Sequence, residues 1–224
     1  MKESRGRARG HPIELSVLRL APVRRLLAAQ WTSLSGDWAM LAALPFVVYS
    51  LGGGAGEIGL GFAASAVSLV CLVLLGGVLA DRHGRRRTLL FAETARMVTQ
   101  AALAASLLLG IARPWQVIVA MAAIGAGEAL AQPALSGLTA EIVPAGRLQA
   151  TNALRGMLAS VAVLTGPALA GLALLSGSPG AAVALEAASY GLSALLLRGL
   201  RPPGGAWLRG TGGSFLADMR GGWA

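Results

Sequence analysis

Two carboxylates interrupt stretches of the chain that are otherwise apolar. Asp37 follows Gln30 and Ser33 at helical spacings of four and three, so these three side chains share one face of a helix. Glu128 lies in the middle of another apolar run. A charge inside a lipid bilayer is costly unless it faces water or a partner. We therefore expect Asp37 to face substrate or carry a proton, and Glu128 to carry a proton or bind a cationic substrate. The alternative for Asp37 is a structural hydrogen-bonding group, and for Glu128 a partner for Arg155 or for polar groups on another helix.

Other charged residues also stand next to or inside apolar runs. Glu93 and Arg96 are three residues apart, which lets them pair on one helix face. We expect a structural pair that helps to hold the basic turn before it. Arg155, early in its run, joins Gln30 among the candidates for transport or proton coupling, with snorkelling to the headgroups as its alternative. Glu186 lies near the start of the last run, at its outer end, where we expect a structural role.

The composition indicates the elements that must position these side chains. The 224 residues are 55% hydrophobic and 13% charged, whereas a soluble domain has about 25% charged residues. The apolar residues come in blocks near the length of about 20 residues that crosses a bilayer as a helix. We therefore predict an all-α membrane protein with six transmembrane helices. The predicted spans are Leu26–Leu51, Glu57–Ala80, Thr88–Ile111, Trp115–Thr139, Leu148–Leu175 and Ala181–Leu200.

The positions of Lys and Arg predict the orientation. Sixteen of them lie in the N-terminal tail, in Asp81–Arg87, in Glu141–Arg147 and from Arg198 onward, whereas Arg113 stands alone in the loops on the other side. Basic loops are retained in the cytoplasm. We therefore expect both termini there, with the protein in a cell membrane.

The same pattern divides the chain into three segments. Residues 1–25 form a basic cytoplasmic tail, residues 26–200 the six-helix membrane unit, and residues 201–224 a cytoplasmic linker rich in Pro and Gly. The single cysteine excludes a disulfide within one chain, and the two histidines lie far apart, without metal-ligand spacing. No aromatic-rich basic face suited to nucleic acid is present. We expect no metal, no cofactor and no nucleic-acid partner.

The turn between the second and third apolar runs contains an ordered series of glycine, aspartate and arginine. It reads Gly77-Val-Leu-Ala-Asp81-Arg82-His83-Gly84-Arg85-Arg86-Arg87. Gly84 suits a turn residue with a positive φ. The series resembles the signature loop between the second and third spans of the major facilitator superfamily, which implies a cytoplasmic gating loop. We expect Asp81 to hold a neighbouring helix end or arginine in one state and to release it in the other. An ordinary basic hairpin is the alternative.

A second resemblance lies in the fifth run. The stretch Gly166-Pro167-Ala-Leu-Ala-Gly171 is similar to the core of a motif that marks proton-driven exporters in this superfamily. Small residues admit a neighbouring backbone and Pro167 frees a carbonyl, which predicts a close-packed, kinkable helix. An ordinary proline kink is the alternative.

From Leu26 to Trp223 the chain most resembles bacterial drug and siderophore exporters, including macrolide-efflux-like and enterobactin-exporter-like proteins. The resemblance implies that the chain is the N-terminal half of a twelve-span fold, with the second half beyond Ala224. Each half of such a fold is built from two inverted three-helix repeats. The resemblance also implies alternating-access export of a small amphipathic molecule by proton antiport. The residues that carry it are Gln30, Asp37, Pro45, Pro133, Arg147, Asn152, Gly166, Pro167 and the signature loop.

Other interpretations of the whole chain remain open. One is a six-span subunit or scaffold that works as a homodimer, and another is a truncated fragment that does not transport. An enzyme is not expected, because no set of nucleophile, base and orienting residue lies on one side of the membrane. The expected partners are the lipid bilayer, a small-molecule substrate, and either a C-terminal six-helix half or a second copy.

Overall fold

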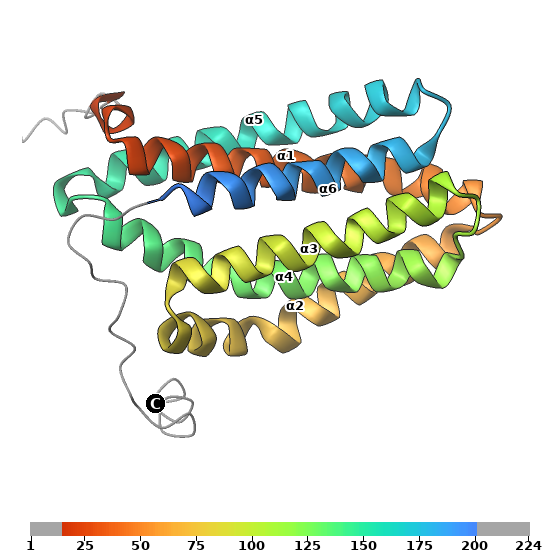
Figure 1. Ribbon diagram of the computed structural model, residues 1–224, viewed down its shortest axis with the longest axis horizontal. Coiled ribbons are helices and arrows are strands. Elements are labelled where there is room, and N and C mark those ends of the chain that lie inside the picture. Colours follow the sequence, from red (N-terminus) through yellow and green to blue (C-terminus); the bar gives the residue numbers. More distant parts are fainter. Residues whose placement is uncertain (1–14, 201–224) are drawn as a thin grey trace, which may run out of the picture.

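The computed structural model describes residues 15–200, and the remaining predicted tail and linker lie outside the described residues. A short 3-10 helix, η1 (Leu15–Arg19), leads into six long α-helices (Figure 1). A second 3-10 helix, η2 (Ala145–Arg147), precedes the fifth of them. The α-helices are α1 (Ala21–Ser50), α2 (Ala55–His83), α3 (Arg85–Leu108), α4 (Pro114–Ile142), α5 (Leu148–Leu174) and α6 (Pro179–Arg198).

Four of the six helices are long and apolar enough to cross a membrane, namely α2, α4, α5 and α6. The sequence predicts six spans. The structure has six long helices, but α1 and α3 do not meet this criterion for crossing a membrane. Polar and charged residues lower the mean hydropathy of both helices. Helix α3 begins with three arginines and contains Glu93 and Arg96, and α1 contains Gln30, Ser33 and Asp37. In α3, Glu93 and Arg96 turn inward and are buried.

The signature turn is shorter than predicted. The sequence predicts a loop over Asp81–Arg87, but α2 continues through His83 and α3 starts at Arg85. Gly84 alone joins the two helices, and its φ of 88° confirms the prediction of a positive φ. The first helix likewise starts inside the predicted tail, with Pro22 in its first turn. A proline is favoured there because its missing N–H has no helical partner at that position.

The helices form two groups of three that do not follow the chain order (Figure 1). One group contains α1, α5 and α6, and the other contains α2, α3 and α4. The most extensive packing is between α2 and α4, between α1 and both α5 and α6, and between α3 and both α4 and α6. The pair α3–α6 joins the two groups.

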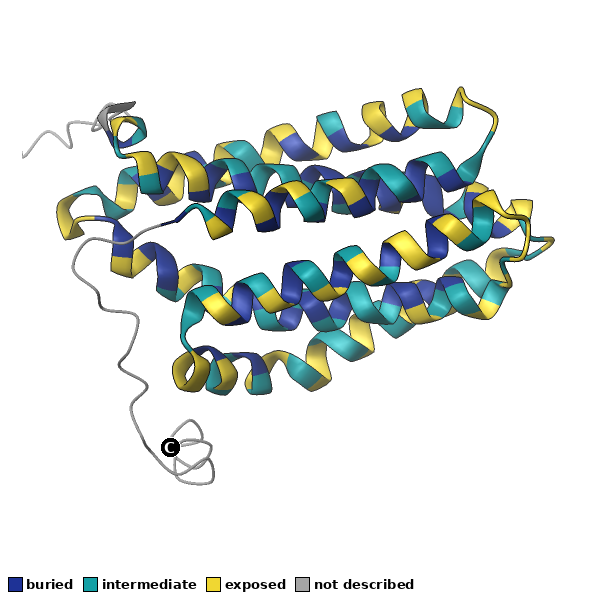
Figure 2. Ribbon diagram, viewed as in Figure 1, coloured by how far each residue is buried: buried dark blue, intermediate teal, exposed yellow. Residues whose placement is uncertain are grey.

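Buried side chains gather where the helices face one another, and exposed ones lie outward (Figure 2). Two apolar clusters fill the interior at successive levels. One cluster includes Leu26 and Leu138, and the other includes Leu44 and Val117. On each of α1, α3, α4 and α6, the residues between these two levels include buried or half-buried polar groups. The fold therefore holds a polar layer between two apolar ones.

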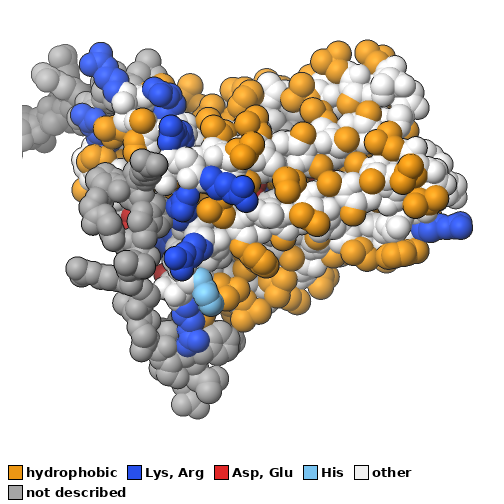
Figure 3. All heavy atoms as spheres, in the orientation of Figure 1, with side chains coloured by type: hydrophobic (Ala, Val, Ile, Leu, Met, Phe, Trp, Pro, Cys, Tyr) orange, Lys and Arg blue, Asp and Glu red, His pale blue; other side chains and the backbone are white. Residues whose placement is uncertain are grey.

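The outer surface of the bundle is apolar over most of its length. In Figure 3 hydrophobic side chains cover the middle of the visible face, and most of the visible Lys and Arg side chains lie toward one end. Helix α2 is the least buried of the four apolar helices, and its Val70 is 72% exposed. On α5, Leu164 is 75% exposed. Surfaces of this extent need lipid or another protein to cover them.

Candidate functional site

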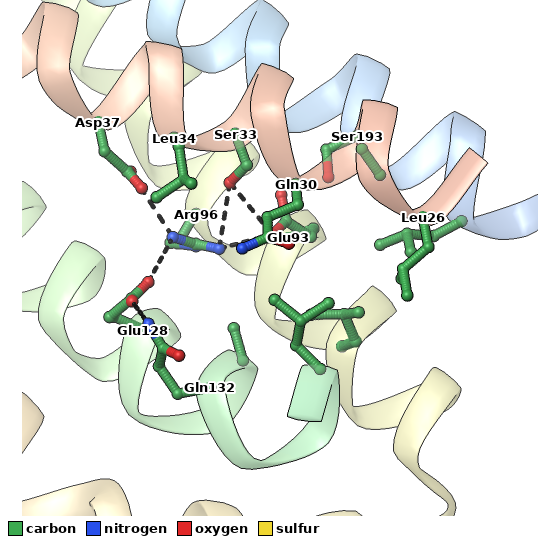
Figure 4. A pocket seen from close by; sticks show the side chains of 15 residues that line it. Leu26, Gln30, Ser33, Leu34, Asp37, Glu93, Arg96, Glu128, Gln132 and Ser193 are labelled. Atoms are coloured by element: carbon green, nitrogen blue, oxygen red, sulfur yellow. Dashed lines mark hydrogen bonds and ion pairs between the residues drawn. The ribbon is translucent and has the colours of Figure 1, made fainter. Parts of the chain in front are cut away.

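Arg96 is the centre of the polar layer (Figure 4). Its side chain is 2% exposed and forms an ion pair with Glu93, one helical turn earlier, with Nη2 lying 2.6 Å from Oε1. The other end of the guanidinium, Nη1, lies 3.6 Å from Asp37 Oδ1 on α1 and 3.5 Å from Glu128 Oε2 on α4. One arginine therefore joins carboxylates from three helices.

Neutral polar groups complete the surroundings of these carboxylates. Ser33 donates a hydrogen bond of 3.3 Å to Glu93 Oε1. Gln132, one turn along α4, donates a hydrogen bond to Glu128. The ring of Tyr190, on α6, packs against the guanidinium of Arg96, with 4.5 Å between the guanidinium carbon and the ring centroid, and its hydroxyl contacts Asp37. This stacking places a fourth helix against the same arginine.

The charges in this layer do not balance when all groups are ionised. One guanidinium faces three carboxylates within 3.6 Å, which leaves an excess of two negative charges around a buried arginine. An unpaired buried charge is costly and tends to be removed by protonation or by binding an opposite charge. The arrangement is therefore suited to take up a proton or a cation at the carboxylates that open to a cavity.

Asp37 and Glu128 each line two hollows. The first is a cavity of about 40 Å³ beside Arg96, which has room for water because one water needs roughly 10–15 Å³ measured in this way. The second is an open apolar pocket of about 510 Å³ between α1, α2 and α4. Trp38, Phe62 and Met121 are among the residues that line it. The two acids thus connect an apolar pocket with the buried arginine.

The residues predicted from the sequence are partly brought together. Asp37 and Glu128, predicted as separate candidates, meet at Arg96. Gln30 lines the same small cavity and accepts a hydrogen bond of 2.9 Å from Arg155 Nε. Arg155 thus reaches the edge of the site through Gln30. The structure gives no direct ion pair between Arg155 and Glu128 among the described residues, which was one alternative considered for Glu128.

The placement of the Glu93–Arg96 pair corrects the sequence interpretation. The two residues do contact each other, as their spacing predicts. We expected the pair to hold the basic turn, but the further ion-pair partners of Arg96 lie on α1 and α4. The physical reason is that α3 turns this face inward between α1, α4 and α6, away from the turn at its own start.

Two residues of the site were missed by the sequence analysis. Tyr190 lies four residues after Glu186, and Gln132 lies four residues after Glu128. Both pairs make side-chain hydrogen bonds. This spacing is the signal that could have found them, because residues four apart on a helix are neighbours.

The predicted gating residues bind helix ends. Arg85 Nη1 donates to the carbonyl of Gly137 at 2.9 Å and lies 3.1 Å from Glu141, also on α4. Asp81 is 3.8 Å from Arg85 and largely exposed. Arg86 donates hydrogen bonds of 3.0 and 2.6 Å to the carbonyls of Leu197 and Arg198. The carbonyls of Leu197 and Arg198 are the last two of α6 and lack helical partners, so an arginine is favourable there.

The other members of the two motifs have different surroundings. Arg82 is exposed near the end of α2. A Cβ at Gly77 would meet nothing within 4 Å, and the same is true of Gly171. A Cβ at Gly166, in contrast, would lie 2.8 Å from the carbonyl oxygen of Ser35 on α1. Gly166, which precedes Pro167, therefore lets α5 approach the backbone of α1 closely.

Comparisons with known proteins agree with this architecture. The family model described as Major Facilitator Superfamily matches residues 26–221. The "Uncharacterized MFS-type transporter YfiS" of Bacillus subtilis (strain 168) is 27% identical over 173 residues, which are 77% of this chain and 40% of that protein. The chain thus spans less than half the length of this relative. Because the family match covers most of the chain, the protein belongs to the Major Facilitator Superfamily of multi-pass membrane transporters.

Proposed function

We propose that this chain is the N-terminal six-helix half of a secondary transporter that exports a small amphipathic molecule, preferably a lipophilic cation, in exchange for protons. The observation that carries the proposal is that Asp37 and Glu128 line the apolar pocket on one side and contact Arg96 on the other. An apolar pocket with two carboxylates at its edge is complementary to an apolar body with a positive charge. Protons and such a cation compete for the same carboxylates, which couples their movements.

The packing supports a fold built from two three-helix repeats. Exchanging α1, α2 and α3 with α4, α5 and α6 converts the α2–α4 contact into α5–α1 and the α1–α6 contact into α4–α3. All four of these contacts are among the extensive ones. In such transporters the two halves move against each other around a central site. We propose that the exposed apolar faces of α2 and α5 lie against lipid and against the second six-helix half.

The orientation is part of the same proposal. The turn arginines and the ends of α4 and α6 lie at one end of the bundle, and Arg113, which directly precedes α4, lies at the other. Basic residues favour the cytoplasmic side. We therefore propose that the signature turn faces the cytoplasm in the bacterial inner membrane.

Neutral variants of the two carboxylates test the coupling. In proteoliposomes containing the full-length gene product, we expect Asp37→Asn and Glu128→Gln each to slow pH-gradient-driven movement of a fluorescent lipophilic cation. The expected loss is at least roughly tenfold, or about 1.4 kcal/mol of barrier. Glu57→Gln is the matched control, because it makes the same chemical change at a carboxylate with a different place in the fold. The Glu57 carboxylate lies at the start of α2, where it accepts a hydrogen bond from the backbone N–H of Gly54. Unchanged rates in both neutral variants, with normal insertion, would contradict the proposed function.

Asp81→Ala tests whether the signature turn has a gating role. We expect this variant to insert and fold normally, because an exposed ion pair contributes only about 0–1 kcal/mol. We also expect slower transport, since Arg85 then loses its carboxylate partner within the turn and keeps the one on α4. The initial transport rate and the thermal stability are measured on the same preparation. A wild-type rate would mean that the turn is a structural hairpin only.

A further inference from the structure

A carboxylate that the proposed site does not use lies deeper in the bundle. Glu186, on α6, is 0% exposed. Its Oε1 lies 3.1 Å from the hydroxyl oxygen of Tyr190, whereas its Oε2 has no hydrogen-bond partner among the described residues. The charged groups that face it from the helices packed on α6 are Asp37 on α1 and Arg96 on α3. On α5 the one ionisable residue is Arg155, which bonds Gln30.

The hydroxyl of Tyr190 lies between two acids. It contacts the carboxylate of Asp37 as well as that of Glu186. A phenol hydroxyl has one proton and donates one hydrogen bond, while its oxygen accepts others. An ionised carboxylate only accepts. Both contacts can therefore be full hydrogen bonds, each with its own proton, only if one of the two acids is protonated and donates to the tyrosine oxygen.

The surroundings decide which of the two acids holds this proton. Asp37 lies 3.6 Å from the guanidinium of Arg96, and 22% of its side chain is exposed. Both features favour its charged form. Glu186 is fully buried and forms no ion pair within the part of the chain that the structure describes. Protonated at Oε1, Glu186 donates to Tyr190 and keeps a neutral carbonyl oxygen at Oε2, which removes the cost of a buried anion with one oxygen that accepts no hydrogen bond.

We propose that Glu186 is a second proton-binding site, connected to Asp37 through the hydroxyl of Tyr190. In this proposal, Glu186 is protonated and donates to Tyr190, and Tyr190 donates to ionised Asp37. Transfer occurs when the Glu186 proton moves to the tyrosine oxygen as the tyrosine proton moves to Asp37 Oδ1. The O–H bond of Glu186 breaks and an O–H bond forms at Asp37, while the tyrosine loses one proton and gains another. The net result is the passage of one proton from Glu186 to Asp37. The use of this proton in transport rests on the proposed function.

Infrared spectroscopy of the full-length gene product in lipid tests the proposal without measuring transport. A protonated carboxyl group has a carbonyl stretching band distinct from the bands of a carboxylate. At neutral pH we expect the wild-type protein to show such a band, shifted both by ¹³C-labelled glutamate and by D₂O. We expect Glu186→Gln to remove this band and Glu57→Gln to retain it. Tyr190→Phe should keep the band but raise its frequency, because the carboxyl group loses its hydrogen-bond acceptor.

Two results would overturn the proposal. One is a labelled wild-type protein without a protonated glutamate band, which requires no variant to fold. The other is a band that neither Glu186→Gln nor Tyr190→Phe alters. Failure of the proposed function is recognised separately, by unchanged pH-driven transport in Asp37→Asn and Glu128→Gln. A glutamate band that responds to both substitutions supports the proton site whatever the transport assay shows.

Discussion

Replacing Arg96 by methionine is expected to lower the free energy of unfolding by about 3 to 5 kcal/mol and to abolish transport. The guanidinium is 2% exposed and faces Asp37, Glu93 and Glu128. Methionine fills a similar volume but leaves these acids without a cation. The cost is largely the burial of unpaired negative charge, and Glu93, at 3% exposed, carries most of it.

Reversible unfolding in mixed detergent micelles measures this effect. Arg87→Met is the matched control, because it makes the same chemical change at an exposed position of α3 and should stay within about 0.5 kcal/mol of the wild type. The double variant Arg96→Met with Glu93→Met should recover part of the loss, because a buried ion pair can be replaced by apolar groups. A single Arg96→Met variant as stable as the control would show that the carboxylates do not depend on this arginine.

The neighbouring glycines Gly76 and Gly77 are expected to respond in opposite directions to alanine. A Cβ at Gly76 would lie 2.9 Å from the carbonyl carbon of Ala129 and 3.0 Å from the Cα of Leu130 on α4. Backbone cannot move aside as a flexible side chain can, so α2 and α4 must separate. Overpacking of this kind costs about 1–3 kcal/mol. At Gly77 a Cβ meets nothing within 4 Å, and alanine in a helix interior gains about 0.5–1 kcal/mol over glycine.

Thermal unfolding of Gly76→Ala and Gly77→Ala, prepared side by side, measures the difference. We also expect Gly76→Ala to impair transport more than Gly77→Ala, because Ala129 directly follows Glu128 and a shift of α4 there moves the carboxylate. Equal stabilities for the two variants would contradict the close α2–α4 packing. The pair is informative because both glycines are neighbours in one helix, and they differ in that Gly76 faces α4 whereas Gly77 faces open space.

Some of the site was predictable because its signals are local. The spacing of Glu93 and Arg96 places them on one helix face, and the structure has them in contact. Gly84 was predicted to suit a positive φ because it is the glycine of a turn between two apolar runs, and its φ is positive. Asp37 and Glu128 were chosen because a charge in an apolar run needs a partner. None of these inferences requires knowledge of how helices pack.

The amino-acid sequence by itself determined the helical membrane class, the approximate bounds of six long helices and the family signature, because hydropathy and charge order are properties of neighbouring residues. The tertiary structure decided which side chains meet. Arg96, Asp37, Glu128 and Tyr190 come from α3, α1, α4 and α6, and helix packing fixes their rotation and depth. The same packing assigned the close α2–α4 contact to Gly76 and gave Glu186 a tyrosine neighbour that also contacts Asp37. A side chain's partners across a bundle depend on the direction of every helix at once, which no single stretch of sequence specifies.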